Sequence, residues 1–157
     1  KKLQYFDSEI NESYTPYVIE TSIGLDRTFL AIFSYAYQEE KLEDGSERVL
    51  MKIPAILAPY KVAILPLVKK DGLPEKAREI VDNLKFNYMV QYDEKDAIGR
   101  RYRRQDAIGT PYCVTVDNQT LVDNTVTIRE RDTMIQERIN ADNLNAYLAE
   151  KIQPLKM

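Results

Sequence analysis

The pattern of apolar and polar positions divides the first third of the chain into short segments of strand and helix type. Apolar and polar side chains alternate over residues 16–22, which predicts a strand. Over residues 25–40, apolar side chains recur at steps of three and four, which predicts an amphipathic helix. A polar segment over residues 41–48 has the composition of a turn, and we expect a short strand over residues 49–53 after it.

After this point the pattern predicts strands that alternate with helices. The strand expected over residues 62–68 is apolar on both faces, which is typical of a central strand in a covered sheet. The other expected elements are a helix over 71–84, a strand over 88–92, a helix over 98–108, strands over 112–117 and 126–131, and a helix over 141–152. This alternation predicts an α/β three-layer domain with a mixed β-sheet flanked by helices. Because Pro54 and Pro59 bracket a linker-like segment, we expect a domain boundary there, with domains over 1–53 and 54–157.

The expected helix over residues 98–108 carries an unusual cluster of positive charge. Its four arginines are Arg100, Arg101, Arg103 and Arg104. At about 100° per residue they cover roughly 160° of the helix surface, and Ile98 and Tyr102 point to the other side. A guanidinium can bind phosphate bidentately and stack on a base, so nucleic-acid contact is one prediction. A solvated helix face balanced by nearby acids is the alternative.

Charge and composition narrow the possible functions. The formal net charge is −3, but residues 1–53 carry −4 and residues 54–157 carry +1, so the overall sign does not exclude nucleic acid. The chain has no histidine, which excludes Ser–His and Cys–His catalysis, and we expect no metal site. Its single cysteine, Cys113, lies in an apolar strand and is expected to be buried and inert. No apolar run approaches the roughly 20 residues of a membrane helix, and no signal peptide opens the chain, so we expect a soluble, cytoplasmic protein.

Several segments resemble the class II aminoacyl-tRNA synthetases. Residues 17–27, YVIETSIGLDR, resemble their third signature motif, a strand that runs into a helix through Gly-x-Asp-Arg. Residues 57–69 resemble the opening strand of their anticodon-binding domain. The segments over residues 98–106, 109–111 and 125–133 resemble the glycine-specific members, the glycyl-tRNA synthetases of the dimeric single-polypeptide type. The resemblance covers essentially the whole chain, but the first and second signature motifs are missing, so we expect a C-terminal piece.

The resemblance implies a substrate site near the third signature motif. It implies that Glu20 takes the ammonium group of glycine and that Ser22 lies against its Cα, in a pocket formed by Glu20, Thr21, Ser22, Ile23 and Gly24. It also implies that ATP is held by Gly24, Leu25, Asp26 and Arg27, with Arg27 as the catalytic residue. The alternatives are an exposed edge-strand glutamate at position 20 and an Arg27 that pairs with Glu20 or Asp26.

The reaction implied has two steps. Glycine attacks the α-phosphate of ATP, with Mg²⁺ usually present, and a ribose hydroxyl of the tRNA then takes the glycyl group. The piece lacks the second-motif arginine, so we expect it to be inactive alone, to hold no cofactor tightly and to be monomeric, whereas the full enzyme is expected to be a homodimer. The implied anticodon contacts are Arg100, Arg101, Arg103, Arg104, Thr127, Arg129 and Arg131, with Tyr102 a weaker stacking candidate. About half of these are expected to face RNA, because some arginines have Asp106, Glu130 or Asp132 as possible partners.

Two other functions compete with this interpretation. Accessory subunits of mitochondrial DNA polymerase resemble these synthetases but act as non-catalytic processivity factors. Retention of Glu20, Ser22, Gly24, Asp26 and Arg27 argues against that role. A generic α/β ligand-binding domain is the third possibility, and it leaves the arginine cluster unexplained.

Overall fold

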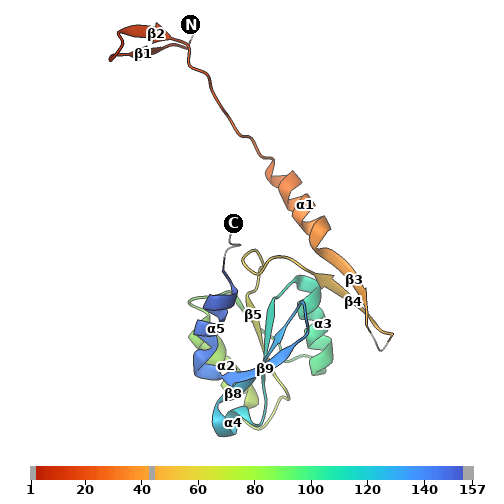
Figure 1. The fold of residues 1–157 in the computed structure, drawn as a ribbon. Coiled ribbons are helices and arrows are strands. Elements are labelled where there is room, and N and C mark those ends of the chain that lie inside the picture. Colours follow the sequence, from red (N-terminus) through yellow and green to blue (C-terminus); the bar gives the residue numbers. More distant parts are fainter. Residues whose placement is uncertain (1–2, 43–44, 154–157) are drawn as a thin grey trace. The chain divides into compact units, whose positions relative to one another are not determined.

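The computed structural model describes residues 3–42 and 45–153 (Figure 1). The chain divides into two compact units after Leu30. The first unit begins with an antiparallel hairpin of β1 (Tyr5–Asp7) and β2 (Glu12–Tyr14). The rings of Tyr5 and Tyr14 face each other across it edge to face, with centroids 5.8 Å apart. The sequence pattern did not predict this hairpin.

The strand predicted over residues 16–22 is wrong. Residues 15–24 belong to no helix or strand, and every side chain in this segment is exposed. A strand needs a neighbour that satisfies its backbone hydrogen bonds, and no strand in the described part of the chain pairs with these residues. The apolar and polar side chains of this segment do alternate, but the described residues provide no neighbouring strand with which it could form a sheet.

The helix predicted over residues 25–40 is correct in its first twelve residues only. Helix α1 spans Leu25–Ala36, and the chain then enters β3 (Tyr37–Lys41), which pairs antiparallel with β4 (Glu47–Met51). The polar sequence of β3 suits a helix locally, but its cross-strand hydrogen bonds to β4 override that preference. Ala36, the last residue of α1, packs in a small apolar cluster with Met51 at the end of β4 and with Ile53 and Ala58 beyond it.

The rest of the second unit is built on a five-stranded mixed sheet with strand order β6-β5-β7-β8-β9 (Figure 1). Strand β5 is parallel to β6 and β7, whereas β8 is antiparallel to β7 and β9. The strands are β5 (Val62–Pro66), β6 (Val90–Tyr92), β7 (Tyr112–Val116), β8 (Thr125–Glu130) and β9 (Gln136–Asn140). The helices are α2 (Leu73–Leu84), α3 (Ile98–Ile108), α4 (Thr120–Asp123), the 3-10 helix η1 (Ala141–Asn143) and α5 (Leu144–Lys151). The predicted mixed sheet flanked by helices is confirmed, while β9 and α4 were not predicted.

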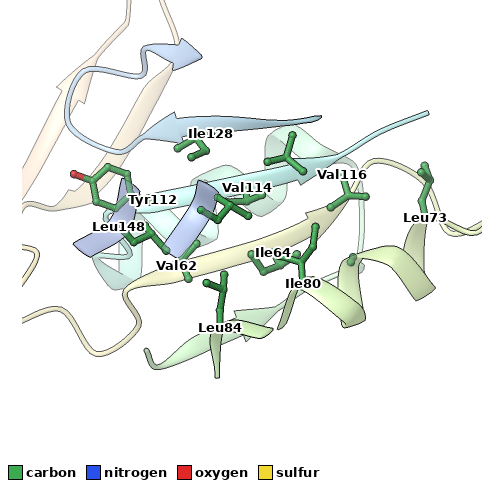
Figure 2. Close-up of a cluster of buried hydrophobic side chains, with 13 residues drawn as sticks. Val62, Ile64, Leu73, Ile80, Leu84, Tyr112, Val114, Val116, Ile128 and Leu148 are labelled. Carbon is green, nitrogen blue, oxygen red and sulfur yellow. The ribbon is translucent and has the colours of Figure 1, made fainter. Parts of the chain in front are cut away.

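The two faces of β5 explain why its sequence is apolar throughout. Val62 and Ile64 point into the main core, where α2 and α5 cover the sheet (Figure 2). The alternate residues Ala63 and Leu65 point to the opposite face, where they pack with Cys113 under α3. The side chains of β5 are therefore buried on both faces, as predicted for a central strand.

The prediction that Cys113 is buried is confirmed, and its reactivity follows from that position. The residue is 1% exposed, and burial raises the pKa of its thiol to about 12. Because reagents attack the thiolate, we expect no labelling by an aromatic disulfide reagent at pH 8 while the chain is folded, and full labelling in denaturant. Release of the coloured thiolate measures both, and rapid labelling in native buffer would contradict this packing.

Candidate nucleic-acid interface

The topology of the sheet defines one edge at which a ligand can bind. The connection from β5 to β6 runs through α2, which packs on one face, and the connection from β6 to β7 runs through α3, which packs on the other. The chain therefore changes direction between the neighbouring strands β5 and β7. In open α/β sheets, ligands bind beyond the carboxyl ends of the strands at such a switch point. Here this edge includes the ends of β5 and β7 and the amino end of α3.

The buried Arg101 connects the segments that form this edge. It is 2% exposed, and its guanidinium donates to the backbone oxygens of Pro66 at 2.6 Å, Leu67 at 3.2 Å and Asp93 at 3.3 Å. Its Nε also donates to the backbone oxygen of Asp96 at 3.1 Å. One side chain thus ties the end of β5 to the loop between β6 and α3. The expectation of a single cationic face on α3 is therefore wrong for Arg101, whose guanidinium points into the domain.

A second buried network lies behind α3, around the carboxylate of Asp106. This side chain is completely buried, and both guanidinium nitrogens of Arg129 donate to it, at 2.8 and 3.0 Å. Arg48 and Arg103 approach the same carboxylate at 3.3 and 3.5 Å. The Arg129 guanidinium also lies 4.9 Å from the centroid of the Tyr102 ring. Arg129 is therefore enclosed between α3 and the sheet.

The same network attaches the β3–β4 hairpin to the sheet domain. Arg48 of β4 is 3% exposed; it donates to the backbone oxygen of Arg131 at 3.0 Å and forms an ion pair with Glu40 at 2.6 Å. Arg131 is itself buried, with hydrogen bonds to the backbone oxygen of Gly109 and to the carboxylate of Asp132. The sequence analysis did not select Arg48, because nothing local marks it as the partner of a residue 58 positions away.

The remaining arginines of α3 lie at the surface. Arg100 is exposed, and the side chains of Arg103 and Arg104 are each 41% exposed. Arg104 is held by the carboxylates of Asp93 at 2.8 Å and Asp96 at 2.7 Å. A hydrogen bond from Arg104 lowers the pKa of Asp96. The three arginines line a shallow hollow together with Ala97, Gly99 and Ala107.

A polar cluster on β7, β8 and β9 extends the same edge. Arg138 of β9 forms a bidentate ion pair with Asp117, at 2.8 Å for both bonds. It also donates to the hydroxyls of Thr125 at 2.6 Å and Thr127 at 3.3 Å. The hydrogen bond from Arg138 lowers the pKa of Asp117 to about 2. The sequence analysis named Thr127 as an anticodon contact but did not select Arg138, because β9 has too few apolar residues to be recognised as a strand.

The residues predicted to bind glycine and ATP lie in one continuous segment of the first unit. Glu20, Thr21, Ser22 and Ile23 are exposed in the non-regular segment before α1. Gly24 begins the helix, since its carbonyl oxygen accepts the backbone N–H of Thr28 at 3.0 Å. Leu25, Asp26 and Arg27 form the first turn, where a carboxylate suits the positive end of the helix dipole. All eight residues from Glu20 to Arg27 are exposed.

The described residues contain neither a group of metal ligands nor a helix suited to a membrane. Over residues 3–42 and 45–153, no three His, Cys, Asp or Glu side chains come together in a group that could hold a metal ion. In the same ranges, no helix has the length and apolar character needed to cross a membrane.

Comparison with solved structures relates the fold to one RNA-binding domain. The chain superposes with a TM-score of 0.59 on the crystal structure of the RNA binding domain of threonyl-tRNA synthetase from Cryptosporidium parvum, over 66% of this chain and 26% of that one. The sequence identity is 24%, so this likeness is evidence for the fold alone.

Comparison with curated proteins identifies much more similar sequences. The chain is 52% identical to the glycine–tRNA ligase of Chlorobaculum tepidum over 97% of its own length, and 52% identical to that of Clostridium tetani over 98%. It spans only 32% and 33% of the length of those two proteins. The model of the anticodon binding domain matches residues 61–151, which include the whole five-stranded sheet with its helices. The chain therefore belongs to the anticodon binding domain family.

Proposed function

We propose that this chain supplies anticodon recognition within a glycine–tRNA ligase. The observation that carries the proposal is the accessible arginine surface of α3, formed by Arg100, Arg103 and Arg104, beside the switch point of the sheet. Unpaired loop bases are recognised by stacking and by hydrogen bonds to their edges, while cations hold the phosphates. The similarity to curated glycine–tRNA ligases supports glycine tRNA as the RNA.

The predicted anticodon residues take two different roles in this proposal. The exposed Arg100 and the partly exposed Arg103 contact the RNA directly, with Thr127 offering a hydroxyl on the neighbouring sheet face. Arg104 is also 41% exposed, but its nitrogens donate to Asp93, Asp96 and the backbone oxygen of Lys95, so it offers the RNA the face of its guanidinium. In contrast, Arg101, Arg129 and Arg131 are 2–3% exposed and have their guanidinium groups occupied by protein oxygens. We assign these three arginines to positioning the strands and α3. Tyr102 is half-buried, and its hydroxyl is hydrogen-bonded to that of Thr115 at 2.5 Å. We therefore also assign Tyr102 to positioning α3 against β7.

The catalytic part of the proposal concerns residues 20–27. We infer that Glu20 and Ser22 bind glycine and that Arg27 binds ATP, with Mg²⁺, in the complete enzyme, and that residues 1–53 belong to its catalytic domain. The identity to the relatives extends over 97% of the chain, including this segment, which supports the inference. The exposure of the segment is explained if the rest of the pocket comes from the part of the relatives that this chain does not span. We expect the chain alone to be monomeric and inactive in glycine-dependent pyrophosphate exchange, and the complete enzyme to be a cytoplasmic homodimer.

Replacing both Arg100 and Arg103 by alanine should weaken binding to glycine tRNA and flatten its salt dependence. For every phosphate that the variant no longer neutralises, the slope of log K against log[salt] should fall by about one. Fluorescence anisotropy with labelled tRNA at several salt concentrations measures the slope. The control is Lys85→Ala, which removes a cation that is 50% exposed at the end of α2, on the face of the sheet opposite α3. If the control flattens the slope as much as the double variant does, the α3 surface is not the RNA-binding face.

A further inference from the structure

The ion pair between Asp117 and Arg138 is partly exposed, but it belongs to a dense set of hydrogen bonds. All five N–H donors of Arg138 have acceptors: the Asp117 carboxylate takes two, the hydroxyls of Thr125 and Thr127 take two, and the backbone oxygen of Thr125 takes the last at 3.3 Å. The side chain of Arg138 remains 30% exposed. The guanidinium is therefore a fixed plane with no donor left for RNA, and what it offers a ligand is a surface for stacking.

The carboxylate of Asp117 complements this plane, because it keeps hydrogen-bonding capacity on one oxygen. Its Oδ1 accepts from Arg138 and from the backbone N–H and hydroxyl of Thr120, at 3.1 and 3.3 Å. Its Oδ2 accepts only from Arg138 among the residues that the structure describes. The side chain of Asp117 is 22% exposed, so part of it is open to solvent. An ionised carboxylate is an acceptor only, and it selects donors over acceptors.

These two features fit one unpaired base better than they fit a phosphate. A phosphate oxygen needs donors, and this pair offers an acceptor beside a cation whose donors are already used. A base that stacks on the guanidinium can present an exocyclic amino group to the free carboxylate oxygen. Aspartate accepting from the N4 amino group of cytosine is an established pairing of this type. Uracil presents a carbonyl oxygen at the same place, which the carboxylate repels.

We propose that Asp117 is a specificity-determining residue that reads the amino group of an anticodon cytosine stacked on Arg138. This inference rests on the proposed function, since the glycine codons GGN require anticodons that end in cytosines. It adds a base-reading element, formed by Asp117 after β7 and by Arg138 of β9, to the arginine surface of α3. Asp117 follows the carboxyl end of β7, at the edge where the topology places a ligand.

The test compares anticodon stem–loop RNAs of a glycine tRNA in which each anticodon cytosine is replaced in turn by uracil. We expect the unchanged chain to discriminate against the uracil loops. Asp117→Asn keeps an oxygen for Thr120 but adds amide donors, so at one anticodon position it should lose the preference for cytosine. Binding to the cytosine loop should fall about 10- to 100-fold, the range of one base-edge contact, while binding to the loop with uracil at that position is retained.

Two further variants separate base reading from charge and from folding. Asp142→Asn removes the same charge from an exposed carboxylate that accepts from Asn124 and, among the contacts that the structure describes, has no hydrogen bond to Asp117, Thr125 or Arg138, and it should leave discrimination unchanged. Arg138→Lys removes the flat guanidinium on which the base stacks, so it should weaken binding of the cytosine loop and of the uracil loop equally. If the unchanged chain discriminates and Asp117→Asn keeps that preference at every position, this inference is wrong while the proposed function stands. If the unchanged chain binds no loop, both are wrong.

Discussion

Replacing Asp106 by asparagine is expected to lower the free energy of unfolding by about 3–5 kcal/mol, the cost of removing one partner from a buried ion pair. Both charged nitrogens of Arg129 depend on this carboxylate, and Arg129 is only 3% exposed. Arg48 keeps Glu40 as a partner, but Arg129 has no other carboxylate among the contacts that the structure describes. The substitution changes little volume, so the loss measures the uncompensated charge. Urea denaturation followed by far-UV circular dichroism gives the value.

Asp82→Asn is the matched control for this prediction. Asp82 lies on α2, where its carboxylate is 65% exposed and pairs with Lys85 one helical turn away. An exposed pair of this kind contributes at most about 1 kcal/mol. Equal losses for the two variants would mean that the network around Asp106 does not stabilise the domain.

Replacing Gly109 by alanine is expected to destabilise the domain by about 2–4 kcal/mol, the combined cost of an unfavourable backbone conformation and a steric overlap. The residue ends α3 with φ of +86°, a conformation that costs a residue with a side chain roughly 1–2 kcal/mol. An added Cβ would also lie 2.9 Å from Cγ2 of Ile53 and 3.0 Å from the backbone oxygen of Met51. The backbone oxygen belongs to β4, so relief requires the hairpin to move away from α3. Thermal unfolding of the purified variant measures the effect.

Gly72→Ala separates the two contributions at Gly109. Gly72 has nearly the same φ of +82°, but an added Cβ there meets no atom within 4 Å. Its variant therefore reports the cost of the backbone conformation alone, and the Gly109 variant should lose clearly more. Equal destabilisation would show that the close approach of α3 and β4 is absent in solution.

The sequence was sufficient to predict the elements whose signals are local. Helix α3 ends at Gly109 and packs through Ile98 and Tyr102, as expected from their positions opposite the arginines. Strand β5 is central because its apolar residues serve both faces. The polar strand β9 was missed because its pairing with β8, and not its own sequence pattern, holds it in place.

The site was less predictable because a long side chain does not reveal its direction through periodicity. Arg101 and Arg100 are neighbours on one helix, yet the first is buried against backbone oxygens and the second is exposed. The direction is decided by acceptors on distant segments, such as Pro66 for Arg101 and Asp106 for Arg129. The sequence therefore located the arginine cluster, but only the tertiary structure separates the positioning arginines from those at the surface.

The central claim, anticodon recognition, is tested most directly by binding of this chain to glycine tRNA and to the same tRNA with an exchanged anticodon, at two salt concentrations. The account predicts tighter binding to the native anticodon at both salt concentrations, with a salt dependence for both RNAs that reflects the arginines of α3. Equal affinity for the two RNAs would contradict it and would favour a non-catalytic nucleic-acid-binding subunit related to these ligases.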